Sequence, residues 1–168
     1  PGDSVRFSID KDKWEFTGKN SGNYNFFPEL SEKIGEQPVF KGNFRIYKNQ
    51  LDSIYKLKIK FLQNYLISHN NVSKSFSSEI QSEFKYEYLY NLIAPRAIKS
   101  RVEDISFNTS DGFYSVVGNN HSIREEDFLD VKEYFDKISI EDFKRPDLLN
   151  NDYFKRSIVE FIRFYFSN

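Results

Sequence analysis

Apolar and polar residues alternate at the start of the chain. Val5, Phe7 and Ile9 are separated by polar residues, and the alternation resumes over Trp14–Thr17, just before Gly18. A two-residue period is typical of a strand with one buried face, so the sequence predicts two short strands. Two strands alone are marginally stable. We expect them either to rest on the helices or to complete a sheet whose other strands lie upstream, and we favour the second arrangement.

Beyond a polar Gly- and Asn-rich loop over residues 19–24, apolar residues recur at three- and four-residue intervals, the period of an amphipathic helix. We expect a short helix that ends at Gly35 and Pro38, and a long helix over residues 43–69. A second long helix is expected to end just before Pro95, because proline breaks a helix. The three apolar faces are Phe27, Leu30 and Ile34; Phe44, Tyr47, Leu51, Ile54, Tyr55, Leu62, Tyr65 and Leu66; and Phe76, Ile80, Phe84 and Tyr88.

One stretch of the first long helix has a competing pattern. From Tyr55 to Phe61 apolar and polar residues alternate strictly, as they would in a strand. We interpret the stretch as helix, because the 3.6-residue pattern continues on both sides and the whole segment is longer than a usual strand. This interpretation puts Lys58 within the apolar arc. Its ammonium must therefore extend to solvent or find a carboxylate.

The C-terminal third predicts two more helices, after an irregular segment over residues 103–121. Ser122 and Glu125 form a capping box ahead of the first helix. Asn150 or Asn151 is expected to cap the last helix, whose apolar residues cover more than half of its circumference. We expect that helix to be deeply packed or to contact something outside this chain. The apolar residues are Phe128, Val131, Phe135 and Ile138 in the first helix, and Phe154, Ile158, Val159, Phe161, Ile162, Tyr165 and Phe166 in the second.

Together these elements predict a mainly α fold, a helical bundle of about four to five helices with a short N-terminal β-hairpin. We expect residues 1–18 to be the terminal strands of an N-terminal β-element that is the end of an upstream β-domain. Residues 19–168 are expected to form the helical domain.

Composition narrows the chemistry. The chain has 18 Phe, 11 Tyr and one Trp but no Cys and no Met. Without Cys there is no disulfide, thiolate nucleophile or Cys-zinc site. The net charge of -1 argues against a general nucleic-acid binder, and no apolar run approaches the length of a membrane span. The helical spacing of the rings favours core packing over ligand stacking.

Few residues are candidates for a functional site. His69 is expected at the end of the first long helix and His121 in a loop before Ser122; neither has a second His or a Cys at metal-ligand spacing. We therefore predict no catalytic, cofactor-binding or metal-binding residue. A basic cluster after Pro95 is expected to interact with the last helix carbonyls, or else with an anion or an acidic partner. An acidic run is expected to be a solvated helix face rather than a cation site. The basic cluster is Arg96, Lys99 and Arg101, and the acidic run is Glu125, Glu126, Asp127, Asp130, Glu133 and Asp136.

The order of parts resembles a known family. Pro1-Gly2-Asp3-Ser4 leads into a strand, Phe16-Thr17-Gly18-Lys19-Asn20 follows, and Pro146-Asp147-Leu148-Leu149-Asn150-Asn151-Asp152-Tyr153-Phe154 enters a final aromatic helix. This order is similar to the region before the thioredoxin-like domain in the large TlpA-like thiol:disulfide interchange lipoproteins of Gram-negative bacteria. The resemblance implies a periplasmic or outer-membrane-associated protein, an adjoining thioredoxin-like domain as partner, and a lipid anchor outside this chain. The redox Cys pair of that family has no counterpart here.

Three functional hypotheses follow. The first, favoured by the resemblance, is a non-catalytic helical accessory, spacer or interaction domain with apolar faces and no deep polar cleft. The second is an enzyme that uses carboxylates with His121 or His69 as base, which requires a pocket where a histidine meets several acidic groups. The third is a small-molecule or glycan-binding module with an aromatic-lined cleft that includes Trp14.

Overall fold

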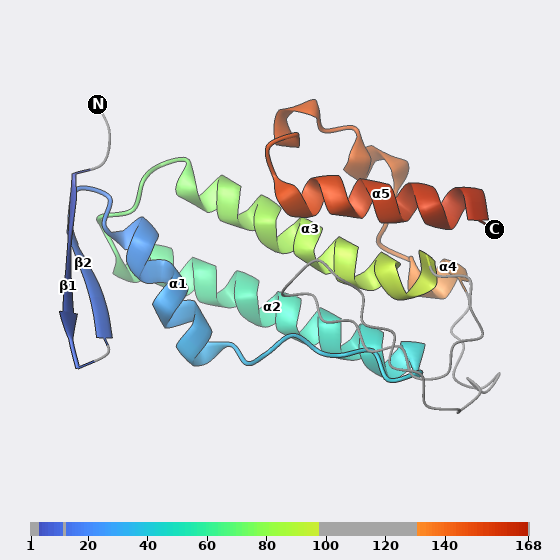
Figure 1. The fold of residues 1–168 in the computed structure, drawn as a ribbon, viewed down its shortest axis with the longest axis horizontal. Helices are drawn as coiled ribbons and strands as arrows, with labels where there is room; N and C mark the ends of the chain where they lie inside the picture. The colour runs from blue at the N-terminus through green and yellow to red at the C-terminus, as the bar shows by residue number, and fades with distance from the viewer. Residues whose placement is uncertain (1–3, 12, 98–130, 168) are drawn as a thin grey trace. The chain divides into compact units, whose positions relative to one another are not determined.

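The computed structural model describes residues 4–11, 13–97 and 131–167. The predicted mainly α fold with an N-terminal hairpin is confirmed (Figure 1). The elements are β1 (Val5–Asp10), β2 (Lys13–Gly18), α1 (Gly22–Lys33), α2 (Phe44–Ser68), α3 (Phe76–Ala97), α4 (Val131–Tyr134) and α5 (Asp152–Ser167), with short 3-10 helices η2 (Ile140–Phe143) and η3 (Pro146–Leu148) between α4 and α5. The irregular segment and the Ser122 capping box predicted above lie outside the described residues.

The chain divides into two compact units. The first unit is Pro1–Glu36 with Ile54–Phe84, and the second unit is Gln37–Ser53 with Lys85–Asn168. The chain passes between the units at three points: one lies after Glu36, between α1 and α2, and the other two fall inside α2 and α3. These two helices therefore each contribute residues to both units. The hairpin belongs to the same unit as α1. The proposed division into a β-element over residues 1–18 and a helical domain over residues 19–168 stays a prediction.

The hairpin is antiparallel, and Lys11, directly after β1, has a φ of +46°. Phe7 pairs with Phe16 in the strand register. β2 is the strand that contacts α1, and β1 lies on its far side (Figure 1). Asn25 of α1 binds the outer edge of β2 as a neighbouring strand would, because its Oδ1 accepts from the Phe16 N–H and its Nδ2 donates to the Phe16 carbonyl, both at 2.8 Å. The hairpin therefore rests on α1 through β2.

Phe26 is the centre of the first unit's core. Its ring contacts those of Tyr65 and Phe76 at centroid distances of 5.1 Å, and those of Phe61 and Phe84 at 5.4 and 6.2 Å. The prediction that Phe27 faces the core is wrong: Phe26 is 0% exposed and Phe27 is 52% exposed.

The incorrect assignment of Phe27 to the core comes from the position at which α1 begins. The helix starts at Gly22, inside the predicted loop, because Gly22 is held at both its backbone groups. Its N–H donates to the Asn71 carbonyl at 3.1 Å, and its carbonyl accepts from the Tyr65 hydroxyl at 2.8 Å. These contacts join residues 43 and 49 positions apart in the sequence, so the local pattern could not reveal them.

α2 is helical through the stretch whose alternation favoured a strand, as the longer apolar pattern predicted. Lys58 is buried there, and its ammonium lies 5.2 Å from the centroid of the Phe84 ring. This distance is in the range of a cation–π contact. The face of the Phe84 ring is thus an environment for the Lys58 ammonium that was not expected, in addition to solvent or a carboxylate.

α3 continues to Ala97, so the prediction that it ends just before Pro95 is wrong. Pro95 has no N–H to donate to the carbonyl of Asn91, four residues earlier. In the second unit the Tyr47 hydroxyl donates to that carbonyl instead, at 3.1 Å. The helix tolerates the proline because a tertiary contact replaces the missing donor. Burial, reinforced by Tyr90, raises the pKa of Tyr47, so its hydroxyl keeps the proton that it donates.

The second unit has its own aromatic core. Phe44 contacts Phe40 at 4.5 Å and Tyr134 at 5.3 Å, and Tyr86 contacts Phe154 at 4.8 Å. Tyr134 of α4 is buried, whereas Phe135, which was expected on the apolar face of this helix, is only partly buried.

The cap of α5 agrees with the prediction, since Asn151 Oδ1 accepts from the Phe154 N–H at 2.7 Å. Phe154 is buried, whereas Val159 and Ile162 are exposed. Of the two alternatives expected for α5, deep packing therefore does not hold at Val159 and Ile162, and contact with something outside this chain stays a prediction there. Glu160, which lies between them in the sequence, is buried. Glu160 holds a salt bridge with Arg163 at 2.8 Å, which compensates part of the cost of its burial.

A polar network also lies in the second unit, around Asp52. Its carboxylate accepts from the Tyr88 hydroxyl at 2.6 Å and from the Lys48 ammonium at 3.2 Å, and Lys137 lies 3.7 Å away. Burial by itself raises the pKa of Asp52, but these hydrogen bonds and the positive charges of Lys48 and Lys137 outweigh it. The net pKa lies below the ordinary value.

Candidate functional site

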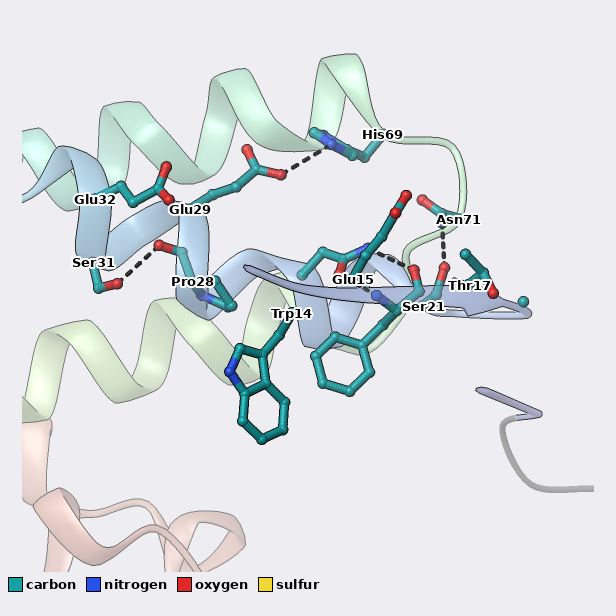
Figure 2. A pocket seen from close by; sticks show the side chains of 13 residues that line it. Trp14, Glu15, Thr17, Ser21, Pro28, Glu29, Ser31, Glu32, His69 and Asn71 are labelled. Carbon is teal, nitrogen blue, oxygen red and sulfur yellow. Dashed lines mark hydrogen bonds and ion pairs between the residues drawn. The ribbon is translucent and has the colours of Figure 1, made fainter. Parts of the chain in front are cut away.

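A pocket of about 700 Å³ opens in the first unit, along the outer edge of β2 (Figure 2). Its other walls are α1 and the segment that follows α2. The lining residues come from these three parts: Trp14, Glu15, Phe16, Thr17 and Gly18; Ser21, Asn25, Pro28, Glu29, Ser31 and Glu32; and His69 and Asn71.

The β2 wall offers both an aromatic ring and backbone groups. Trp14 is 57% exposed, and its indole stacks on Phe7 at 6.3 Å between ring centroids. In an antiparallel pair, backbone groups alternately face the partner strand and face away from it. Because the N–H and C=O of Phe16 face Asn25, those of Trp14, two residues earlier, lie on the same outer edge. The pocket is thus bordered by an indole together with a backbone donor and acceptor.

Three carboxylates also line the pocket. Glu15 comes from β2, whereas Glu29 and Glu32 lie one turn apart on α1. Among the described lining residues none is Lys or Arg. Figure 2 shows Glu29 and Glu32 on one wall and Glu15 on the hairpin side. The pocket therefore carries negative formal charge on more than one wall.

His69 lies where the sequence placed it, directly after the last residue of α2. Its ring stacks on Tyr65 at 3.8 Å between centroids. Nδ1 is 3.1 Å from the Tyr65 carbonyl oxygen and 3.0 Å from the Ser68 hydroxyl oxygen. The hydroxyl can donate or accept but the carbonyl can only accept, so the carbonyl contact favours a hydrogen on Nδ1. Nε2 then faces the pocket, where Glu29 Oε1 is 3.5 Å away.

That orientation has a chemical consequence. A protonated imidazole donates from both nitrogens, to the Tyr65 carbonyl and to Glu29. A neutral ring with its hydrogen on Nδ1 has an acceptor at Nε2, which favours a ligand or water that donates a hydrogen bond. Burial, reinforced by the negative charge of Glu29, raises the pKa of the Tyr65 hydroxyl to about 12, so this neighbour stays a neutral donor.

The walls are tied together by contacts between α1 and the segment after α2. Asn71 Nδ2 donates to Ser21 Oγ at 2.6 Å, and the side-chain amide of Asn23 makes two hydrogen bonds with Ser73, at 3.0 and 2.9 Å. A Cβ on Gly22 would lie 2.8 Å from Val72 Cγ2, which shows how closely the two segments approach. The pocket is thus formed by packed and hydrogen-bonded elements rather than by a free loop.

The other candidates from the sequence do not join this pocket. Glu133 forms an ion pair with Arg45 at 2.8 Å and Asp136 with Lys48 at 3.3 Å, both in the second unit. These pairs agree with the predicted solvated face. His121, Glu125, Glu126, Asp127, Asp130, Lys99 and Arg101 lie outside the described residues, as does the side chain of Arg96.

Two further findings concern only the part of the chain that the structure describes. It contains no group of three or more His, Asp or Glu side chains placed to hold a metal ion. None of the described helices is both long enough and apolar enough to cross a membrane.

Sequence reasoning named Trp14 and His69 but missed the three glutamates. They belong to no motif, and they come from a strand and a helix whose approach depends on Asn25. The spacing of Glu29 and Glu32 was the one visible signal, because residues three apart share a helix face.

Comparison with protein-family models, curated proteins and solved structures found no match to this chain. The resemblance to the TlpA-like lipoproteins, with the location and the partner domain that it implies, stays a prediction.

Proposed function

We propose that this chain is a binding module whose first unit takes up a small organic cation in the pocket beside β2. The observation that carries the proposal is the pocket itself: three carboxylates and an exposed indole around one cavity, with no Lys or Arg among the described lining residues. Its volume lies within the range of about 300–1,000 Å³ that is usual for small-molecule sites.

The charge of the pocket favours a cation over an anion or a neutral molecule. A cleft lined by charges of one sign concentrates ligands of the opposite sign. An ammonium group over an indole face gains a further cation–π attraction of about 0.5–2 kcal/mol. Because the carboxylates are distributed around the walls, they suit a ligand of several atoms better than a single metal ion.

The competing hypotheses make different demands on the same residues. The catalytic hypothesis requires a histidine that meets several carboxylates. His69 lies 3.5 Å from Glu29 and lines the same pocket as Glu15 and Glu32, but the hypothesis also requires a reacting group that Nε2 can reach. The accessory-domain hypothesis expects apolar faces without a polar cleft, so this pocket favours it less. Both remain predictions, with the catalytic one tested by turnover and the accessory one by binding to a thioredoxin-like domain.

Trp14 makes a direct binding test possible, because it is the single tryptophan of the chain and lines the pocket. Its fluorescence would be titrated with choline, with the uncharged carbon isostere 3,3-dimethylbutan-1-ol, and with glucose. We expect a saturable change with choline and a much weaker one with the isostere. Equal responses to choline and its isostere would contradict recognition of charge. Saturation with glucose alone would support the glycan-binding alternative instead.

Matched variants locate the effect. Removing one carboxylate, in Glu29→Gln or Glu32→Gln, should weaken choline binding about fivefold, since a pair of charges near 4 Å is worth about 1 kcal/mol in water. Glu36→Gln is the control, because Glu36 is exposed just beyond α1 and does not line the pocket. If all three variants bind alike, the pocket is not the site.

A further inference from the structure

Some backbone groups of β1 face away from β2, on the outer edge of the hairpin. The Phe16 backbone faces away from β1, toward Asn25, so its cross-strand partner Phe7 faces away from β2 in the same manner. Val5 and Ile9, two residues on either side, share this direction. Among the described residues, none donates to or accepts from these outward N–H and C=O groups. Such an edge is a template for another strand.

One face of the hairpin at this edge is apolar and exposed. Phe7, Ile9 and Trp14 project to the same face, because alternate residues of each strand and directly paired residues share a face. All three are more than half exposed. Arg6 and Ser8 are on the opposite, polar face. A strand that fits this edge must therefore bring apolar residues to one face and polar or charged residues to the other.

A second copy of β1 meets these requirements. In an antiparallel pair of β1 strands, outward-facing residues must lie opposite outward-facing residues, and these are the odd-numbered ones. One such register sets Ser8 opposite Ser8. It pairs Phe7 with Ile9 in both directions, and each of these pairs exchanges both N–H···O bonds.

Charge favours the register with Ser8 opposite Ser8 over other registers. This register places position 6, an arginine, opposite position 10, an aspartate, twice across the interface. The register with Phe7 opposite Phe7 sets Arg6 opposite Ser8, and the register with Val5 opposite Phe7 sets Arg6 against Arg6. Directly opposed unlike charges stabilise a strand pair, and like charges destabilise it.

We infer that two copies of this chain associate through antiparallel β1 strands, with Ser8 on the two-fold axis, so that two hairpins form one continuous sheet. The two exposed apolar faces then become neighbours on one side of that sheet. The β2 edge that borders the pocket is on the other side of each hairpin. Self-association therefore leaves the pocket open, and the inference of self-association can be tested independently of ligand binding.

Amide hydrogen exchange on the unaltered protein tests the inference without any variant. The amides of Phe7 and Ile9 should gain at least tenfold protection between about 10 µM and about 1 mM protein, a range that covers weak dimers. The amides of Arg6 and Ser8, which face β2, are the internal control and should be protected at both concentrations. Absence of any concentration dependence at Phe7 and Ile9 would overturn the inference.

Charge reversal tests the register. By sedimentation velocity, Arg6→Asp and Asp10→Arg should each weaken self-association at least tenfold, because each opposes like charges. An equimolar mixture of the two variants should associate again, since every acid then faces a base. Lys41→Asp, at an exposed loop position, is the control for net charge. If the reversals have no effect, or if the mixture stays monomeric while the Phe7–Phe16 contact persists by NMR, the proposed register is wrong.

Discussion

Phe26 provides the sharpest test of how the aromatic residues are used. Its ring is fully buried and contacts five other rings, including that of Phe27, at centroid distances between 5.1 and 6.2 Å. Replacing it with alanine removes the side chain from the middle of this cluster and leaves a cavity. Such Phe→Ala changes cost about 3–5 kcal/mol. Because a whole domain is stable by about 5–15 kcal/mol, the variant should lose a large part of its stability.

Urea unfolding followed by Trp14 fluorescence is the appropriate assay, because Trp14 and Phe26 belong to the same unit. The next residue gives a matched control: Phe27→Ala removes an equal side chain from the same helix, but Phe27 is half exposed. We expect the control to cost about 1 kcal/mol or less. Equal losses in the two variants, or a loss below about 1 kcal/mol for Phe26→Ala, would refute the idea that the rings of this unit are used for interior packing.

Three other predictions concern stability. Asn91 is 2% exposed and its side-chain amide has no hydrogen-bond partner among the described residues, so Asn91→Leu should raise the free energy of unfolding by about 1 kcal/mol in urea titrations. The pKa of Asp52 is lowered in the folded state, so the stability that this carboxylate contributes is complete above its unfolded pKa near 3.9 and is lost as the pH falls through its folded pKa. Asp52→Asn should therefore be less stable than the unaltered protein at neutral pH and should lose less stability on acidification. Thermal unfolding at several pH values would show both effects. Gly22→Ala should lower the melting temperature, whereas Gly35→Ala, where a Cβ meets open space, should leave it unchanged or raise it; equal effects would refute the close approach at Gly22.

The sequence predicted those parts of the fold that depend on local periodicity. The length of α2 and the Asn151 cap follow from pattern and cap chemistry alone, so they were predictable. The start of α1 and the passage of α3 through Pro95 depend on contacts made by Tyr65, Asn71 and Tyr47, which lie far away in the sequence. No local rule contains such contacts, and the assignment of Phe27 to the core failed for this reason.

The candidate site shows the same limit. His69 and Trp14 were visible because each is rare in this chain, with two His and one Trp in total. The three glutamates were not visible as site residues, since Glu is common in this chain. Their common location is apparent only when β2, α1 and the segment after α2 are placed together in the structure. The spacing of Glu15 and Glu29 in the sequence does not indicate that both residues line one cavity.

The most direct measurement is an NMR titration of the protein with choline, monitored at every assigned backbone amide and at the Trp14 indole N–H. Binding in the pocket predicts shifts at Trp14–Gly18, at the start of α1 and around His69–Asn71, with the second unit unchanged. Shifts confined to the second unit, or no shifts up to about 10 mM choline, where even weak millimolar binding would register, would contradict the proposed cation site.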